Sequence, residues 1–421
     1  MSGWEKLRSE WSHGSLRPIA LLLSGTAAAQ FIPLLSMPVL TRLYSPADYG
    51  ALALATSIVT VVFLIATGTL DLAINLPREA EEAENLFLIV LGSATLCATL
   101  LALSGLTERL VFGHTGHRLW YVPVALWLTV AFQTSSAWLN RVAAFRHLAR
   151  ARLVLALATT LGSLGFGWWL GGELGLFLGQ LTGLVCGTAV ALSAAEFWAL
   201  RKRRTLDWVA IKATVHTHRN QPLWQLPSAL VNTVANQIPL WFLQRLFGPS
   251  VLGQYVLMNR VLSAPTSLIS ASVGEVFRQR AATEWHETGA CLKTFNQFAR
   301  GLGLVCVPVG LALIAFGPAA FELIFGIQWR QAGEFARLLG ALFILHWAVN
   351  PLTYVLILSG RQKLNFGLQF LLLGVALAGW GAGALSHSPA VALGVFGSGF
   401  ALFYLVNFVA CRRLAGPAAA R

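Results

Sequence analysis

Residues 42–50 read Arg-Leu-Tyr-Ser-Pro-Ala-Asp-Tyr-Gly, and residues 245–253 read Arg-Leu-Phe-Gly-Pro-Ser-Val-Leu-Gly. The two stretches agree at an arginine, a leucine, an aromatic residue, a proline and a glycine. Each joins one long apolar run to the next. A second match, Leu-Val-Phe-Gly at 110–113 and Leu-Ile-Phe-Gly at 323–326, follows at a similar offset. These matches predict two homologous halves that contain the same turn.

The local chemistry of both stretches predicts the start of a helix. Ser45 is a good N-cap, Pro46 fits the first helical position, and Asp48 stands at the third position of a capping box. In the second copy, Gly248 takes the cap position and Pro249 repeats the proline. A single capped turn is common, so the duplication carries the argument for homologous halves.

Composition places the chain in a membrane. It is 56% hydrophobic and 11% charged, whereas an ordinary soluble domain has about 25% charged residues. Apolar stretches near the transmembrane length of ~20 residues recur throughout. They do not alternate with polar residues, as the strands of an outer-membrane barrel would. We expect an all-α polytopic membrane protein.

Twelve transmembrane helices are predicted, six in each half. Their approximate ranges are 18–41, 47–76, 85–106, 119–140, 152–171, 174–200, 222–246, 250–276, 295–316, 332–358, 364–385 and 389–411. We expect an N-terminal six-helix bundle over 1–200, a basic cytoplasmic linker over 201–221, and a C-terminal six-helix bundle over 222–421. Because six spans is an even number, the halves should be parallel repeats around a central cavity.

The distribution of basic residues predicts the orientation. Most of the 30 Lys and Arg residues fall in loops on one side, which places both termini in the cytoplasm. This bias explains the net charge of +13 without nucleic acid as a partner. The linker at 201–221 is open to two interpretations: a connector that carries topology charges, or a segment lying on an anionic leaflet.

Polar residues occupy one face of several predicted spans, including spans four, seven, eight and ten. Span seven carries Gln225, Ser228, Asn232 and Asn236, and span eight carries Arg260, Ser263 and Ser267. Spacings of three and four place each set on one helical face. A single polar stripe often serves hydrogen bonding between packed helices. Several stripes together, one with an arginine, favour a wet or ligand-filled cavity.

Arginines are the candidate ligands for an anionic substrate. Arg260 lies eleven residues past Pro249, hence ~16 Å into a hydrocarbon core of ~30 Å. A charge there costs about 2.5–3.5 kcal/mol, so we expect it to pair with an acid or to bind an anion. Arg42 and Arg245 stand at the outer ends of spans one and seven, where snorkelling or helix capping is the alternative to a binding role.

Three titratable residues are candidates for proton coupling. Asp71 and Glu275 are expected near the inner ends of spans two and eight, where a simple interfacial placement is the alternative, and His346 lies in span ten. The five cysteines have no metal or redox spacing. No nucleophile and base, phosphate-binding loop or metalloprotease motif is found. We therefore expect no catalytic residues, no metal, no cofactor and no enzymatic activity.

The opening stretch and its surroundings resemble the polysaccharide-export flippases, the Wzx-like branch of the MOP (multidrug/oligosaccharidyl-lipid/polysaccharide) superfamily. In the N-terminal half the resemblance rests on Gly25, Pro38, Arg42, Tyr44, Pro46, Gly50, Asp71, Ala73 and Pro77. In the C-terminal half it rests on Gly253, Tyr255, Arg260, Pro265, Ser272, Val273, Phe325, Gly326, Trp329, Ala332, Gly333, Gly360, Arg361 and Gln362. One departure is Leu70, where the family usually has an aromatic residue before an acid that is commonly glutamate.

The resemblance implies a transporter of the bacterial inner membrane. It would move an undecaprenyl-diphosphate-linked oligosaccharide from the cytoplasmic to the periplasmic leaflet by alternating access, alongside a polysaccharide polymerase or other assembly proteins. Two rival functions are a multidrug antiporter of the same superfamily and a membrane glycan polymerase or ligase. The antiporter would carry mainly acidic cavity residues, and the enzyme would need a sizeable outer loop with paired catalytic residues.

Overall fold

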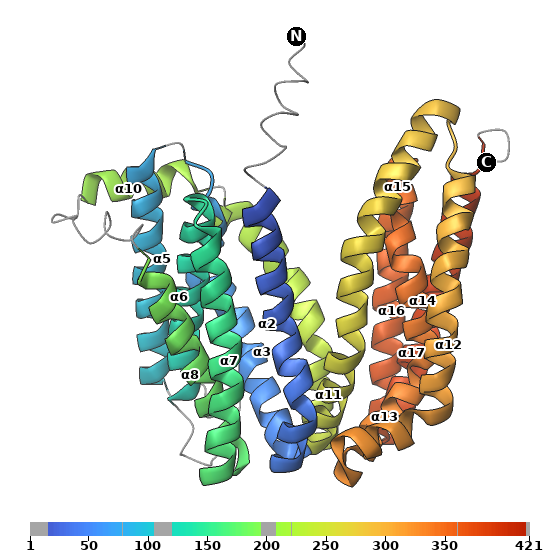
Figure 1. Ribbon diagram of the computed structural model, residues 1–421, viewed down its shortest axis with the longest axis horizontal. Helices are drawn as coiled ribbons and strands as arrows, with labels where there is room; N and C mark the ends of the chain where they lie inside the picture. Colours follow the sequence, from blue (N-terminus) through green and yellow to red (C-terminus); the bar gives the residue numbers. More distant parts are fainter. Residues whose placement is uncertain are drawn as a thin grey trace. The chain divides into compact units, whose positions relative to one another are not determined.

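The computed structural model describes residues 16–77, 79–104, 120–194, 208–219, 221–359 and 361–417. Within these ranges every regular element is a helix (Figure 1). The sequence match at 110–113, the first part of the basic linker at 201–207 and Gly360 lie outside them.

The chain divides into two compact units, Met1–Trp241 and Phe242–Arg421. The division falls inside α11 (Leu226–Thr288), a long helix whose first part belongs to unit 1 and whose remainder belongs to unit 2. The expected bundle boundaries at 200 and 222 stay predictions, as does the repeat axis along the membrane normal.

The described residues of unit 1 form six long helices before α11 begins. Its elements are α2 (Leu16–Leu43), α3 (Pro46–Thr67), α4 (Leu70–Ala73), α5 (Ala80–Ser104), α6 (Tyr121–Arg141), α7 (Phe145–Trp169), α8 (Gly172–Leu192), α10 (Trp208–Thr217) and η3 (Gln221–Gln225). Helix α7 packs against both α2 and α8. The approach of α7 to α8 requires small residues, because a Cβ at Gly179 would lie 2.3 Å from the Ser163 Oγ.

Unit 2 contains the rest of α11 and the helices that follow it. These are α12 (Leu292–Phe325), η4 (Ile327–Trp329), α13 (Arg330–Leu338), α14 (Gly340–Val349), η5 (Asn350–Tyr354), α15 (Val355–Leu358), α16 (Gln362–Ser386) and α17 (Pro389–Ala415). A buried cluster joins α11, α12, the η5–α15 segment and α17 around Phe277, Phe295, Leu352 and Cys411. Burial of these apolar side chains fixes the end of α11 against its neighbours.

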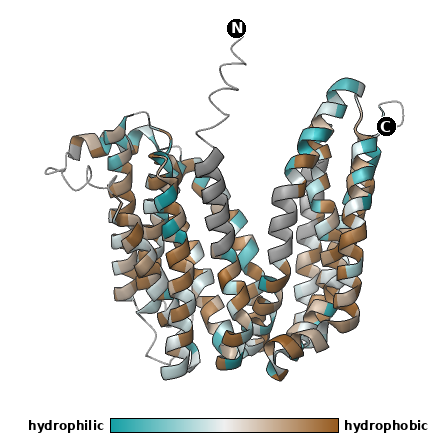
Figure 2. Cartoon of the chain, viewed as in Figure 1, coloured by the Kyte–Doolittle hydropathy of each residue, from teal (hydrophilic) through white to brown (hydrophobic). Residues whose placement is uncertain are grey.

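Where the structure describes them, the twelve predicted spans each overlap one or more helices, and hydrophobic residues run along most of the helices (Figure 2). In the described part of the chain, eight helices are long and apolar enough to cross a membrane. Two spans differ from the prediction. Helix α3 ends at Thr67 because Gly68 turns into the left-handed conformation with φ 57°, and the tenth span changes to a 3₁₀ helix at Asn350–Tyr354, where Pro351 removes a backbone donor.

Both copies of the duplicated turn have the predicted geometry. The Ser45 N–H donates to the Asp48 carboxylate at 2.8 Å, and the Asp48 N–H donates to the Ser45 Oγ at 3.3 Å, which completes the capping box. In the second copy, Gly248 has φ 83° and ψ 178°, and it forms a kink inside α11. Glycine adopts this backbone conformation without the strain that a Cβ would add.

Candidate functional site

The first part of α11 is fixed to unit 1 at both ends. Near its start, the Thr69 hydroxyl donates to the Gln221 carbonyl at 3.3 Å. Near residue 241, the Trp241 indole N–H donates to the Ser57 Oγ on α3 at 2.9 Å. Ser57 is buried, so the second contact holds α11 against the interior of unit 1. These two anchors determine which face of α11 remains open.

The predicted polar stripe lies on that open face. Its residues Gln225, Ser228, Asn232 and Asn236 are all exposed. The Asn236 amide donates to the Asn232 carbonyl at 2.9 Å and to its side-chain oxygen at 3.2 Å. Exposed hydroxyl and amide groups can both donate and accept hydrogen bonds. The stripe therefore offers partners suited to a ligand rich in hydroxyl groups.

Gln225 departs from the α-helical spacing expected for the stripe. It ends η3, a π-helical turn over Gln221–Gln225, so its position follows a wider turn than that of Ser228, Asn232 and Asn236. The π turn also brings η3 against α4, the short helix that carries Asp71. The start of the stripe and one coupling candidate are thus neighbours in unit 1.

The predicted range 47–76 placed Asp71 inside the second span. In the structure Asp71 lies beyond this span, on α4. The cause is the left-handed pair Gly68 and Thr69, which ends α3 and starts α4. Asp71 is half-buried, and desolvation raises the pKa of its carboxyl group, while a hydrogen bond with the Thr67 side chain opposes the rise. A carboxyl group with a raised pKa is suited to taking up a proton.

The first copy of the duplicated turn begins with Arg42, near the end of α2. Two residues later, the Tyr44 hydroxyl donates to the Ser163 carbonyl on α7 at 2.6 Å in a buried position. Glycines make room for this side chain, since a Cβ at Gly175 would lie 2.5 Å from the Tyr44 hydroxyl oxygen. Tyr44 therefore fixes the turn to α7 and α8, while Arg42 stays exposed.

The second part of α11 presents Arg260 on an exposed face. One side of this helix is anchored by Gln254, whose amide donates to the Gln328 carbonyl at 2.6 Å and whose oxygen accepts from the Ala332 N–H at 2.9 Å. Leu257 and Met258 are fully buried on the anchored side. Arg260 follows them and is exposed.

Arg260 and Ser263 share this face, as the sequence predicted. Ser263 is exposed and its hydroxyl donates to the Arg260 carbonyl at 3.4 Å. The side chain of Ser267, expected on the same face, lies outside the described residues. Arg245 is exposed three residues before Gly248, so it stands at the turn, as Arg42 does in unit 1.

The remaining coupling candidates belong to unit 2. Glu275 is exposed on α11. His346, on α14, is half-buried, and its Nδ1 lies 2.7 Å from the Tyr404 hydroxyl on α17. The two rings meet edge to face. Among the described residues, no group of three or more His, Cys, Asp or Glu side chains could hold a metal ion.

Comparison with known proteins identifies the family. A family model described as "Polysaccharide biosynthesis protein" matches residues 39–334. The chain belongs to this family. The matched range includes both duplicated turns, at 42–50 and 245–253, and the exposed face of α11. The resemblance to polysaccharide-export proteins expected from the sequence is confirmed.

Two relatives of this chain are named as biosynthesis proteins. The teichuronic acid biosynthesis protein TuaB of Bacillus subtilis (strain 168) is 29% identical over 143 residues, 34% of this chain and 30% of that protein. The succinoglycan biosynthesis transport protein ExoT of Rhizobium meliloti (strain 1021) is 24% identical over 322 residues, 73% of this chain and 61% of that protein. The matches thus cover less than two thirds of either relative's length.

Solved structures show the fold of the family member. The lipid II flippase MurJ, in an inward closed conformation, aligns with a TM-score of 0.66 at 10% identity, over 95% of this chain and 90% of that one. An inward-facing multidrug resistance MATE family transporter of the MOP superfamily aligns with a TM-score of 0.57 at 13% identity, over 93% of both chains. The all-α polytopic membrane fold is confirmed, in a chain that belongs to a polysaccharide biosynthesis family.

Sequence reasoning missed the partners that position the candidate residues. Tyr404 contacts His346, and Gln254 supports the helix turn before Arg260. Thr69 holds the start of the stripe. Tyr404 and Thr69 lie far from their targets in the sequence, and Gln254, although on the same helix as Arg260, contacts the distant Gln328 and Ala332. No local spacing could have indicated these contacts. A buried Gln or Tyr in a predicted span is the one general hint available.

Proposed function

We propose that this protein is a flippase for a polyprenyl-diphosphate-linked oligosaccharide, and that it moves its substrate from the cytoplasmic to the periplasmic leaflet of a bacterial inner membrane by alternating access. The observation that carries the proposal is Arg260, which is exposed on α11, within a predicted membrane span of a chain that belongs to a polysaccharide biosynthesis family. The proposed undecaprenyl carrier follows from the resemblance to export flippases.

The chemistry of such a substrate suits the exposed groups of each unit. A diphosphate cannot cross hydrocarbon unaided, because burying its charge without partners is too costly. An arginine guanidinium binds phosphate oxygens through two parallel hydrogen bonds, which is the role we assign to Arg260, with support from Arg42 or Arg245. Hydroxyl and amide groups bind sugars, a role we assign to the polar stripe and Ser263.

The names of the relatives support a saccharide substrate. ExoT is a succinoglycan biosynthesis transport protein, and MurJ is a lipid II flippase. A multidrug transporter shares the fold as well, but an exposed arginine in a predicted membrane span favours an anionic over a cationic substrate. A polysaccharide polymerase or another assembly protein would receive the translocated product.

Energy coupling is proposed to pass through Asp71, Glu275 and His346. A proton-driven cycle needs a group that changes its charge as access alternates. Asp71 has a raised pKa, and His346 has a hydroxyl partner in Tyr404 that can donate or accept according to the imidazole tautomer. Neutral replacement of all three should abolish the pH dependence of transport, and unchanged pH dependence would contradict this part of the proposal.

Competition binding separates this function from multidrug export. The purified protein should bind a fluorescent polyprenyl-diphosphate disaccharide, and an unlabelled polyprenyl diphosphate should displace it better than the corresponding monophosphate. A cationic dye such as rhodamine 6G should not displace it at equal concentration. Tight dye binding with no preference for the diphosphate would overturn the proposal in favour of a multidrug antiporter.

A further inference from the structure

We propose that α10 and the residues that follow it, 208–219, form a docking surface for the headgroups of anionic phospholipids. This inference goes beyond the transported substrate and does not depend on it. The sequence allowed two interpretations of the basic linker, a connector or a segment lying on an anionic leaflet. We favour the second for residues 208–219.

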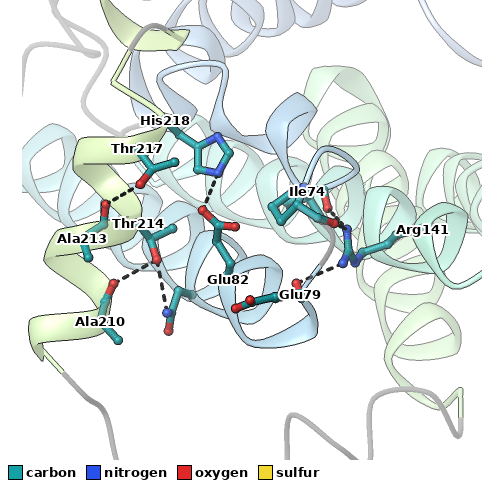
Figure 3. A network of polar contacts seen from close by, with 11 residues as sticks. Ile74, Glu79, Glu82, Arg141, Ala210, Ala213, Thr214, Thr217 and His218 are labelled. Atoms are coloured by element: carbon teal, nitrogen blue, oxygen red, sulfur yellow. Dashed lines mark hydrogen bonds and ion pairs between the residues drawn. The ribbon is translucent and has the colours of Figure 1, made fainter.

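Helix α10 is held to unit 1 along one face. The Thr214 hydroxyl accepts from the Asn85 amide of α5 at 3.3 Å, and His218 Nε2 lies 3.0 Å from the Glu82 carboxylate, also on α5. Thr214 and His218 are four residues apart, so they share a face. Figure 3 shows both contacts, together with Arg141, which binds the carbonyls of Ile74 and Glu79 in the loop before α5.

The opposite face of α10 combines cations with an apolar side chain. The residues on this face are Val209, Lys212, His216 and Arg219, spaced by three, four and three. All four are exposed, and Val209 is 79% exposed. The Arg219 guanidinium lies 3.1 Å from His216 Nε2, which keeps it on the same side as Lys212. Basic groups beside an exposed apolar group are typical of helices that lie in a membrane interface.

The depth of α10 places this face at the level of lipid headgroups. Helix α5 has 25 residues, more than the ~20 needed to cross the hydrocarbon core. Its first turn carries Glu81 and Glu82, which belong in the polar interface. Asn85, which contacts α10, lies only five residues after Ala80, or ~8 Å along the axis. Helix α10 also runs across the end of α5 rather than along it (Figure 1).

Charge complementarity selects anionic lipid as the occupant. Residues 208–219 include Lys212 and Arg219 and no acidic residue. The Glu82 carboxylate lies on the docked side, where His218 is its partner, so the outer face keeps its positive charge. Anionic leaflets attract such segments with a strength that grows with each basic residue. The chain then continues through η3 into the polar stripe, so bound lipid would also steady the start of α11.

Lipid titration of the full-length protein tests the proposal. Native mass spectrometry in detergent would count the phosphatidylglycerol and phosphatidylcholine molecules that remain bound. The natural protein should retain phosphatidylglycerol preferentially, and Lys212→Gln/Arg219→Gln should weaken this binding about fivefold for each charge removed. Val209→Asp should weaken it as well, because the new charge repels the headgroup and removes the apolar contact.

The matched control is Arg412→Gln/Arg413→Gln, which removes two exposed charges from the last turn of α17. It should leave the preference for phosphatidylglycerol nearly unchanged. The proposal would be overturned if the two double variants lost phosphatidylglycerol binding equally. It would also be overturned if the natural protein retained phosphatidylglycerol and phosphatidylcholine equally. Displacement of the bound lipid by equimolar glycerol phosphate would also overturn it, since a free phosphate would then suffice. Unchanged melting temperatures would show that the variants fold.

Discussion

Replacement of Arg260 separates a ligand role from a structural one. We expect Arg260→Ala to lose most binding of the diphosphate-linked oligosaccharide, while the protein inserts into the membrane and folds normally. Arg260→Lys should retain part of the binding, because lysine keeps the positive charge but cannot form two parallel hydrogen bonds to a phosphate.

The exposure of Arg260 determines how large the changes in stability and in ligand affinity should be. Because its side chain is exposed, an ion pair or hydrogen bond that it makes within the protein contributes at most about 1 kcal/mol to stability. A charge-assisted contact with a diphosphate contributes about 1.5–3 kcal/mol to binding, which corresponds to a loss of roughly 10- to 150-fold in affinity. The change in affinity should therefore exceed the change in unfolding free energy.

Two measurements on the same preparations decide between the roles. Affinity for a fluorescent polyprenyl-diphosphate oligosaccharide gives the first, and a thermal melt gives the second. Arg280→Ala is the matched control, because Arg280 is exposed on the same helix twenty residues farther along, or ~30 Å away. Natural affinity in a well-folded Arg260→Ala protein would refute the ligand role. So would a loss of stability larger than the loss of binding.

Three further predictions concern unit 1 and the orientation of the chain. Desolvation raises the pKa of the Asp71 carboxyl group in the folded protein. At pH values between the ordinary pKa of about 3.9 and the raised pKa, the folded state therefore binds more protons than the unfolded state. The free energy of unfolding falls as pH rises through this window. Asp71→Asn should therefore melt higher than the natural protein above the window, with the gap closing below it; a gap that does not vary with pH would contradict this. Tyr44→Phe removes the buried hydrogen bond to the Ser163 carbonyl and should lower the unfolding free energy by about 1 kcal/mol, and an unchanged melt would show that the bond adds nothing. Cysteine probes within 208–219 and after Arg412 should be protected from an impermeant external reagent, and labelling of both would reverse the predicted orientation.

Features encoded by neighbouring residues could be predicted from the sequence. The capping box of Ser45 and Asp48 and the break at Gly248 depend on residues within one turn of each other. The exposed face shared by Arg260 and Ser263 follows from helical spacing alone. The number of spans follows from the length of the apolar runs, because the thickness of the bilayer fixes how many residues each helix needs.

Features that depend on tertiary contacts could not be predicted in the same way. The sequence suggested a second span that runs to residue 76, because apolar residues continue past Gly68, but the left-handed pair at Gly68 and Thr69 ends the helix early and moves Asp71 onto α4. The partner of His346 is Tyr404, 58 residues away on α17. No local pattern encodes which of two distant helices will pack together.

Reconstitution into liposomes tests the central claim most directly. The purified protein would be inserted into vesicles that contain a fluorescent polyprenyl-diphosphate oligosaccharide in both leaflets, and a membrane-impermeant quencher would report the outer-leaflet fraction over time. We expect the protein to move the lipid between leaflets without ATP, and Arg260→Ala to slow the movement strongly while Arg280→Ala does not. Equal rates for vesicles with and without the protein would contradict the proposed flippase function.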